Sequence, residues 1–317
     1  MTTSDGGNEG TAGPGRDVSP ADVFATVGDQ FIAQADATYS LLQLTYELSD
    51  REFDFSVAGL GLSKDQQSQV REALRFVGET IISKTPSANL QIGADPAVER
   101  ALIRTLLNAA HQVKMPSKKL LLRRSMLLLA VSDFELLLGQ VAGHIMELVP
   151  GIANSGDASI TLAELEHLPD MRAARKTVVD RKVDELLRQS MENWVSWFER
   201  AGVKWKDMTD DWCQFAEIFA RRNVVIHAGG KVTSQYLGAL QSAGCKKSDL
   251  PAVGTELELD DLYLTMASEQ LLAFGVLLAA GSWLQVAKGD TDDAELWITS
   301  RCQHLLELQH FRAANAI

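Results

Sequence analysis

One long run of apolar residues constrains the fold of this chain more than any other feature. Between Ser117 and Val149 the apolar side chains recur in steps of four and three. They are Leu127, Val131, Phe134, Leu138, Val141, Ile145 and Leu148. This spacing puts them on one face of an α-helix, because a helix completes a turn in about 3.6 residues. The sequence therefore predicts a long helix that turns one apolar face toward a core.

The rest of the chain also carries helix patterns and almost no strand patterns, in which apolar and polar residues would alternate. Ser19–Asp22 combines a cap residue, a proline and an acid, and Ser63–Gln66 reads as a capping box. We expect the other helices at about 20–48, 63–84, 96–114, 161–167, 172–202, 210–228 and 260–288, and a last one ending near 314. The predicted fold class is all-α.

Composition and breaker residues divide the chain into four expected parts. Residues 1–18 are rich in Gly, Ser, Thr and Asn, and we expect them to be disordered. Residues 19–114 should form an N-terminal helical section, and 117–288 an antiparallel helical bundle, with the boundary in the sequence KMPSKK. Residues 291–317 should form a C-terminal helix after the breaker GDTDD.

The charge of the chain argues against general attraction to nucleic acid. The formal net charge is -12 over 317 residues, whereas non-specific nucleic-acid binders usually carry the opposite sign. An RNA partner would need a local basic patch. The candidates are Lys114, Lys118, Lys119, Arg123 and Arg124, and then Arg172, Arg175, Lys176, Arg181 and Lys182. These residues either form a groove for an RNA backbone or are ordinary solvated helix faces.

The cysteines and histidines predict neither a metal site nor a bound cofactor. Cys213, Cys245 and Cys302 lie far apart and form no CxxC pair, so no disulfide framework or zinc site follows from them. A reducing cytoplasm is the simplest setting. The N-terminus lacks a signal-peptide pattern, and the apolar run from Leu271 to Ala287 reads as a buried helix rather than a membrane span.

The stretch FARRNVVIHAGGKV, from Phe219 to Val232, stands out from this pattern. On a helix that starts near Asp210, one apolar arc carries Trp212, Phe215, Phe219 and Ile226. Arg222 falls inside that arc, so it must reach past the apolar surface, pair with an acid or face a second protein surface. Arg221 points the opposite way, with Glu217 as its partner one turn earlier, and is predicted to be solvated.

A histidine follows Arg222 after five residues. His227 lies about 140° from Arg222 around an ideal helix. The two side chains can still converge, because arginine is long and the pair Gly229–Gly230 predicts that the helix ends directly after His227. A second copy of the chain would bring a second Arg–His pair into the same groove.

The segment RNVVIH resembles the Arg-x(4–6)-His signature of HEPN domains, in which a polar residue, here Asn223, usually follows the arginine. The segment 126–141 is similar to the first bundle helix of these domains, with Glu135 in the place of their frequent acid, and 226–237 is similar to the segment after the motif. The resemblance spans roughly residues 117–288 and implies a HEPN-like bundle.

The resemblance implies a dimeric, metal-independent endoribonuclease, with the motif at the dimer interface and Arg222, His227, Asn223 and Glu135 as site residues. A histidine can move a proton at the 2′-OH or at the leaving oxygen, and a guanidinium matches the charged phosphate. The family further implies a toxin or phage-defence role, with an antitoxin or regulatory partner. It also includes inactive members that serve as dimerisation or regulatory modules.

Each site residue also has a purely structural interpretation. Arg222 could pair with Glu135 and hold two helices together, and His227 could sit favourably at the negative end of the helix. Asn223 could cap or turn the chain. The whole motif could also occur by chance in an unrelated helical scaffold. These alternatives stay open at the level of the sequence.

Overall fold

The fold is known from a computed structural model, which describes residues 19–44, 62–70, 72, 95–113, 118–153 and 160–317. The segment expected to be disordered, residues 1–18, lies outside the described residues. The chain divides into two compact units, and each is treated by itself below. One unit comprises residues 1–44 and 124–317, and the other residues 45–123.

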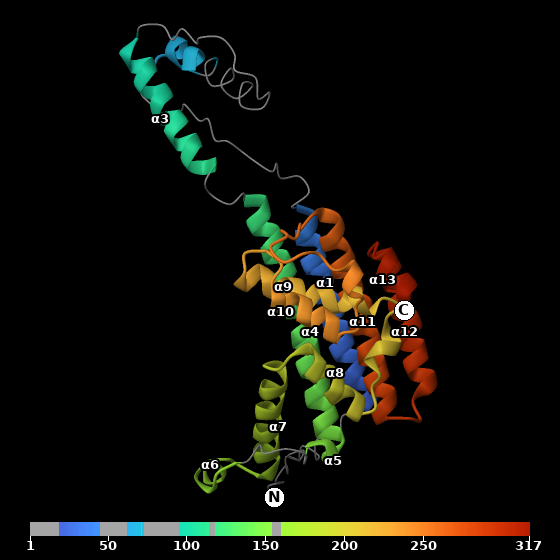
Figure 1. The fold of residues 1–317 in the computed structure, drawn as a ribbon. Coiled ribbons are helices and arrows are strands. Elements are labelled where there is room, and N and C mark those ends of the chain that lie inside the picture. The colour runs from blue at the N-terminus through green and yellow to red at the C-terminus, as the bar shows by residue number, and fades with distance from the viewer. Residues whose placement is uncertain (1–18, 45–61, 71, 73–94, 114–117, 154–159) are drawn as a thin grey trace, which may run out of the picture. The chain divides into compact units, whose positions relative to one another are not determined.

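The regular secondary structure of the described residues is entirely helical, and their only β-type pairing is an isolated bridge between Lys231 and Glu256. This confirms the all-α prediction. The helices are α1 (Pro20–Leu44), α3 (Pro96–Val113), α4 (Lys118–Leu148), α5 (Pro150–Ala153), α6 (Leu162–Glu166), α7 (Met171–Leu187), α8 (Met191–Arg200), η1 (Trp205–Met208), α9 (Trp212–His227), α10 (Ser234–Ser242), η2 (Lys247–Asp249), α11 (Asp261–Val286), α12 (Thr291–Glu307) and α13 (Phe311–Ala316) (Figure 1).

Two helix starts form as the sequence predicts. Ser19 accepts a hydrogen bond from the backbone N–H of Asp22, and α1 begins at Pro20. At the second start, the N–H of Gln66 donates to the Ser63 hydroxyl, while the Ser63 N–H donates to the Gln66 side chain. This reciprocal pair is the predicted capping box. Most of the helix expected after it, at 73–84, lies outside the described residues.

The predicted long helix is α4, and its apolar face is buried in the larger unit. Phe134 is fully buried at the centre of an aromatic cluster, with ring contacts to Phe31 of α1, Trp205 of η1, Phe215 and Phe219 of α9, and Phe274 of α11. Aromatic rings from four other elements therefore meet around one residue of α4. The expected packing of α4 against the motif helix α9 is confirmed by these contacts.

The first helix belongs to the same unit as the bundle, which differs from the predicted division at KMPSKK. α1 packs along α11, where the ring of Phe31 occupies the space that a side chain at Gly275 would need. Its Thr38 hydroxyl donates to Asp133 of α4 at 2.6 Å. The apolar positions of α1 thus contribute to the core of the same compact unit as residues 124–317. The C-terminal helices α12 and α13 also pack on α11.

Two predicted helices are interrupted, and one helix was not predicted. The helix expected at 172–202 is interrupted after Leu187 and resumes at Met191. The C-terminal helix breaks at Gln309, which adopts a positive φ of 67°, before α13 begins. Neither break has a Gly or Pro at its centre, and for that reason the sequence pattern did not reveal it. The helix that was not predicted is α10.

The smaller unit is described over residues 62–70, 72, 95–113 and 118–123. Val98, Ala101 and Leu102 of α3 form a small core with Val70, against which Leu62 packs. The side chain of Gln66 donates to Asp95 at 2.6 Å, just before α3 begins. The sequence resemblance covers none of this core.

Candidate functional site

The motif helix α9 begins and ends as its sequence dictates. Asp211 precedes its first residue and accepts a hydrogen bond from the Gln214 N–H at 2.9 Å. The helix ends at His227, and Gly229 and Gly230 follow with φ of 63° and 93°. Side chains rarely tolerate this left-handed backbone, so the two glycines stop the helix at this point. The predicted end directly after His227 is therefore correct.

Arg222 is held by an acid from the long helix. Its Nη2 donates to both carboxylate oxygens of Glu135 on α4, at 2.7 and 2.8 Å, and its Nη1 donates to Asn223 Oδ1 at 3.0 Å. About a quarter of each charged side chain stays exposed. Burial raises the pKa of Glu135, and the charge and hydrogen bonds of Arg222 work against that rise. The structural interpretation of Arg222, a pair with Glu135, is thus realised.

The same contacts leave part of the guanidinium available. The Nε atom of Arg222 is buried and has no hydrogen-bond partner among the described residues. Nη2 uses both of its hydrogens on Glu135, whereas Nη1 carries two and spends one on Asn223. One donor on Nη1 therefore remains for a ligand. Asn223 lies inside α9 and supports the arginine, so it does not cap the helix.

Arg221 is not the solvated residue that the sequence predicted. Its side chain is 15% exposed, less than the 24% of Arg222. Its Nε donates to Glu217 at 2.6 Å, its Nη1 donates to the carbonyl of Glu258 at 2.6 Å, and its guanidinium lies 3.8 Å from the ring centre of Tyr263. The prediction of Glu217 as its partner is right. The predicted exposure is wrong, because the loop before α11 and α11 itself cover this face.

Glu217 is the centre of a polar network that joins three helices. Besides its contact with Arg221, its carboxylate accepts hydrogen bonds from the hydroxyls of Tyr236 of α10 and Tyr263 of α11, each at 2.8 Å. Burial, and then the charge of Glu217, raise the pKa of both tyrosines, so that they stay protonated donors. This network fixes α9 against α10 and α11 on the side away from Glu135.

His227 lies exposed on the last turn of α9. No hydrogen bond or ion pair of its side chain is seen among the described residues. Asn223 is also exposed, and Ile226 keeps 47% of its surface in solvent. The structure thus places Arg222, Asn223 and His227 on one helix, and brings Glu135 to Arg222 by a direct contact. His227 is joined to that group only through the helix backbone.

Burial along one arc of α9 changes abruptly near Arg222. In the first half of the helix, this arc carries the buried residues Phe215, Ala216, Phe219 and Ala220. In the second half, Arg222, Asn223, Ile226 and His227 continue the same arc with partial or full exposure. The core that covers the first half therefore does not extend over the motif.

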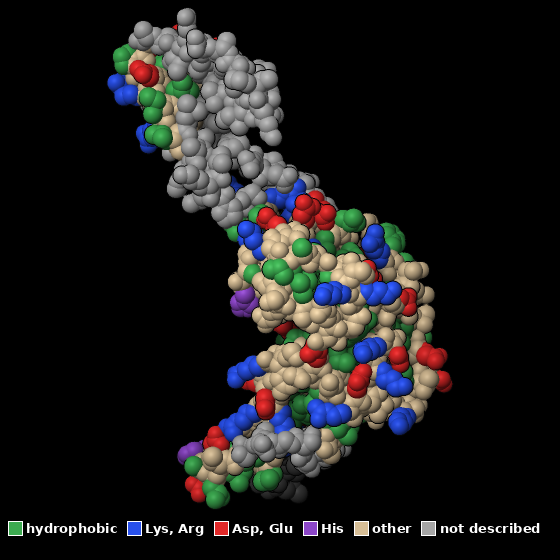
Figure 2. Space-filling view, in the orientation of Figure 1, with side chains coloured by type: hydrophobic (Ala, Val, Ile, Leu, Met, Phe, Trp, Pro, Cys, Tyr) green, Lys and Arg blue, Asp and Glu red, His purple; other side chains and the backbone are tan. Residues whose placement is uncertain are grey.

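The surface of the larger unit is recessed on one side. Figure 2 shows the recess between the part built by α9 and α10 and the lobe of α6 and α7, which are labelled in Figure 1. Leu187, the last residue of α7, reaches α4 at Gly139. One turn before that contact, Leu136 is 58% exposed, and Glu135 precedes it in the sequence. An exposed apolar side chain thus directly follows the partner of Arg222.

One contact to the motif was not found from the sequence. Arg124 of α4 donates from Nη2 to the carbonyl of Gly229 at 2.7 Å, two residues after His227. The sequence placed Arg124 only in a basic cluster. The available signal was its position on α4: eleven residues before Glu135, it falls on the same side of the helix.

Most of the basic residues that could have formed an RNA groove make contacts within the protein. Arg175 donates to the carbonyl of Glu147 at the end of α4, Lys176 pairs with Asp180, and Arg181 pairs with Glu164. Lys119 and Lys182 are buried. Lys114 lies outside the described residues. These contacts support the interpretation of the basic residues as ordinary helix faces. The pairing of Lys176 and Arg181 with acids weakens the case for an RNA groove along α7.

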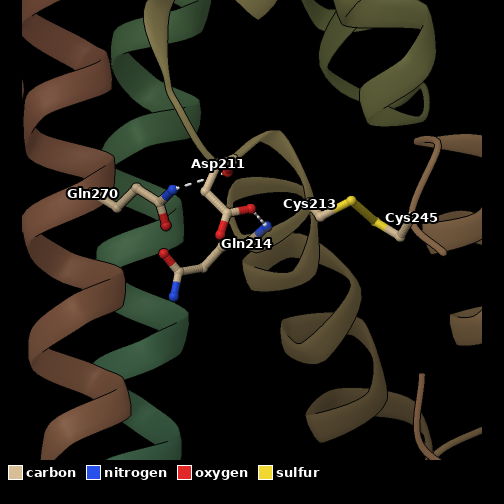
Figure 3. Close-up of a disulfide and its surroundings, with 5 residues drawn as sticks. All are labelled: Asp211, Cys213, Gln214, Cys245 and Gln270. Carbon is tan, nitrogen blue, oxygen red and sulfur yellow. Dashed lines mark hydrogen bonds between the residues drawn. A yellow bond between two sulfur atoms is a disulfide. The ribbon is translucent and has the colours of Figure 1, made fainter. Parts of the chain in front are cut away.

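The structure contains a disulfide that the sequence did not predict. Cys213, in the first turn of α9, is bonded to Cys245, which follows α10, and their Cα atoms are 5.5 Å apart (Figure 3). At the same helix start, Gln270 of α11 donates to the carbonyl of Asp211 at 3.2 Å. A 32-residue separation hid this pair, because only the fold of α9 onto α10 brings the two cysteines together.

A buried histidine forms a second cluster outside the motif. His310 is 1% exposed, and its Nδ1 lies 2.8 Å from Glu269 of α11 and its Nε2 3.1 Å from Asp36 of α1. The other carboxylate oxygen of Glu269 accepts the N–H of Ala313 in α13. Burial alone would lower the pKa of His310, but the hydrogen bond and charge of Glu269, and then those of Asp36, raise it.

Among the described residues, no group of three or more His, Cys, Asp or Glu side chains is arranged to hold a metal ion. Two helices, α4 and α11, are long and apolar enough to cross a membrane, and more than half of each apolar segment is buried in the structure. Such burial is also what core helices of soluble proteins show. Comparison of the chain with protein-family models, curated proteins and solved structures yields no match.

Proposed function

We propose that this chain is a HEPN-type endoribonuclease that acts as a homodimer and cleaves RNA through attack by the 2′-OH. One observation carries the proposal: Arg222, Asn223 and His227 lie where α9 emerges from the core, and one Nη1 donor of Arg222 and the imidazole of His227 bond to no other described residue. A purely structural motif would not need these groups at the surface. The proposal keeps Glu135 as the residue that orients the arginine.

The chemistry assigns each group a role. A base removes the proton of the 2′-OH, whose oxygen forms a bond to phosphorus while the bond from phosphorus to the 5′-oxygen breaks. An acid gives a proton to that leaving oxygen. The products are a 2′,3′-cyclic phosphate and a 5′-hydroxyl. His227 suits either proton transfer, because imidazole titrates near neutral pH. The guanidinium of Arg222 stabilises the negative charge that builds on the phosphate oxygens.

A second copy of the chain supplies the missing half of this acid–base set. One His227 cannot be both base and acid in the same step. Ile226, inside the motif, and Leu136, directly after Glu135 on α4, are 47% and 58% exposed and provide apolar surface for a symmetric contact. In such a dimer the two Arg222–His227 pairs would line one cleft.

The second candidate is a HEPN-like dimerisation or regulatory module without activity. The observation in its favour is the Glu135 carboxylate, which occupies both hydrogens of Arg222 Nη2. The net charge of -12 also repels an RNA backbone. In this case the motif region would still bind a second chain, but it would not cleave RNA.

The test is cleavage of a mixed RNA pool by the purified chain in excess EDTA, followed by analysis of the product ends. The proposal predicts cleavage that persists in EDTA and leaves 2′,3′-cyclic phosphates. Light scattering at high micromolar concentration should show a dimer. An intact dimer that cleaves no RNA supports the regulatory module, and a monomer at that concentration contradicts both candidates.

A further inference from the structure

The turn after His227 is held from two sides. On one side, Arg124 of α4 donates from Nη2 to the carbonyl of Gly229 at 2.7 Å. On the other side, the N–H of Leu257 donates to the carbonyl of Gly230 at 2.8 Å. Within the turn, the N–H groups of Ala228 and Gly230 both bond to the Val224 carbonyl, at 2.8 and 3.1 Å. The backbone around His227 is therefore closely fixed.

Arg124 supplies the only side-chain hydrogen bond to this turn that is seen among the described residues. The final carbonyls of a helix have no partner inside it and carry partial negative charge. A guanidinium near this end is attracted by the helix dipole, and the one of Arg124 satisfies the carbonyl of Gly229, two residues beyond the end of α9. The Nε of Arg124 is buried and has no hydrogen-bond partner among the described residues. The contact of this guanidinium with the turn is therefore the hydrogen bond from Nη2 to Gly229.

Two polar residues of α4 make hydrogen bonds on either side of His227 in the sequence. Glu135 holds Arg222, and Arg124 holds Gly229 beyond His227. They are eleven residues apart, which is close to three full turns, so both fall on one side of α4. Because the imidazole of His227 has no side-chain contact of its own among the described residues, the backbone that Arg124 fixes determines where it lies.

We propose that Arg124 is a positioning residue for catalysis: by holding the Gly229 carbonyl it sets the position of His227 relative to Arg222. The inference rests on the proposed ribonuclease function and adds to it a residue outside the Arg–His motif. Arg124 acts through His227 and does not itself touch the substrate. Its removal should therefore slow the chemical step and leave substrate binding nearly unchanged.

The test compares Arg124→Met with Arg124→Lys and with the control Arg312→Met. Methionine keeps the apolar length of the side chain without a donor, and lysine restores one donor. Arg312 is an exposed residue of α13, so its replacement removes the same charge without touching the turn. Three quantities are measured for each variant: kcat, KM for a fixed RNA, and hydrogen exchange at the Ala228 and Gly230 amides.

For Arg124→Met we expect kcat to fall about 10–100-fold with KM changed less than about twofold, because small displacements of a catalytic group have effects of this size. The two amides should exchange faster. Arg124→Lys should recover part of kcat, and Arg312→Met should match the parent in all three quantities. The recovery by lysine would not be expected if Arg124 only stabilised the fold.

Three results would overturn the inference. Unchanged amide exchange in Arg124→Met would show that Arg124 does not hold the turn. A raised KM with an unchanged kcat would make Arg124 a phosphate-binding residue instead. A parent-like kcat with faster exchange would show that the turn does not position His227. If the parent cleaves no RNA, the proposed function fails, while amide exchange still decides whether Arg124 fixes the turn.

Discussion

The Nη2 of Arg222 on α9 donates hydrogen bonds to both carboxylate oxygens of Glu135 on α4, at 2.7 and 2.8 Å, where the two helices pack together. The pair is only partly withdrawn from solvent, with a quarter of each side chain exposed. It explains how an arginine can occupy an apolar arc. It also sets the orientation of the guanidinium before any ligand arrives.

Glu135→Gln should destabilise the fold, since it leaves a half-buried guanidinium facing a neutral amide. The expected loss in the free energy of unfolding is about 1–3 kcal/mol, between the values for exposed and for buried pairs. Chemical denaturation measures it. The matched control is Asp180→Asn, which removes the charge of an exposed pair with Lys176 and should change stability by less than about 0.5 kcal/mol. Equal losses in the two variants would contradict this account.

Arg221→Ala should also destabilise the protein, contrary to the expectation from sequence. It removes a hydrogen bond to Glu217 and a cation–π contact with Tyr263. Together these predict a loss of about 2–4 kcal/mol in the free energy of unfolding. The melting temperature of Arg221→Ala is compared with those of the parent and of the control Arg188→Ala, which changes an exposed arginine directly after α7. A melting temperature equal to that of the parent would show that the network around Glu217 is not stabilising.

Reduction of the Cys213–Cys245 disulfide should lower stability without unfolding α9. The loop between the two residues spans 32 positions, for which chain entropy predicts about 3–4 kcal/mol. Denaturation with and without a dithiol reductant measures the difference. Cys213→Ser should abolish the reductant effect, whereas Cys302→Ser should preserve it, because Cys302 is the free cysteine. A reductant effect in Cys213→Ser equal to that of the parent would disprove the bond.

The His310 cluster predicts a dependence of stability on pH. Since its folded pKa is raised above the ordinary 6.5, the folded state binds this proton more tightly than the unfolded state. The stabilisation is fully present below about pH 6.5 and is lost as pH rises through the folded pKa. The groups that face the imidazole are Glu269 of α11, Asp36 of α1 and the Tyr39 ring of α1.

The measurement is the free energy of unfolding from pH 5.5 upward for the parent and for His310→Gln. The parent should lose stability relative to the variant as pH rises through this window. His304→Gln, which changes a half-exposed histidine on α12, should follow the parent. Parallel curves for the parent and His310→Gln would show that the cluster does not bind its proton more tightly in the folded state.

The sequence predicted the parts of the fold that depend on local pattern. The stripe through Phe134 defined α4, the caps at Ser19 and Ser63 defined two helix starts, and the glycines after His227 defined the end of α9. Each of these signals acts within a few residues of the chain. They needed no knowledge of what lies across the core.

The features that the sequence did not predict depend on distant segments. Arg221 is covered because the segment at Glu258 and the ring of Tyr263 fold over it. His310 is buried by Glu269 and Asp36, which lie 41 and 274 residues away along the chain. A helical wheel treats each helix alone, and therefore it cannot distinguish a solvated arginine from one covered by another helix.

The central claim is that His227 moves a proton in RNA cleavage, and one measurement tests it most directly. RNA cleavage by His227→Ala is compared in EDTA with that of the parent and of His167→Ala, which changes another exposed histidine. The account predicts that His227→Ala stays folded, keeps its melting temperature and loses about 10²–10⁴-fold in rate, while His167→Ala cleaves like the parent. Cleavage at the parental rate by His227→Ala would contradict the claim.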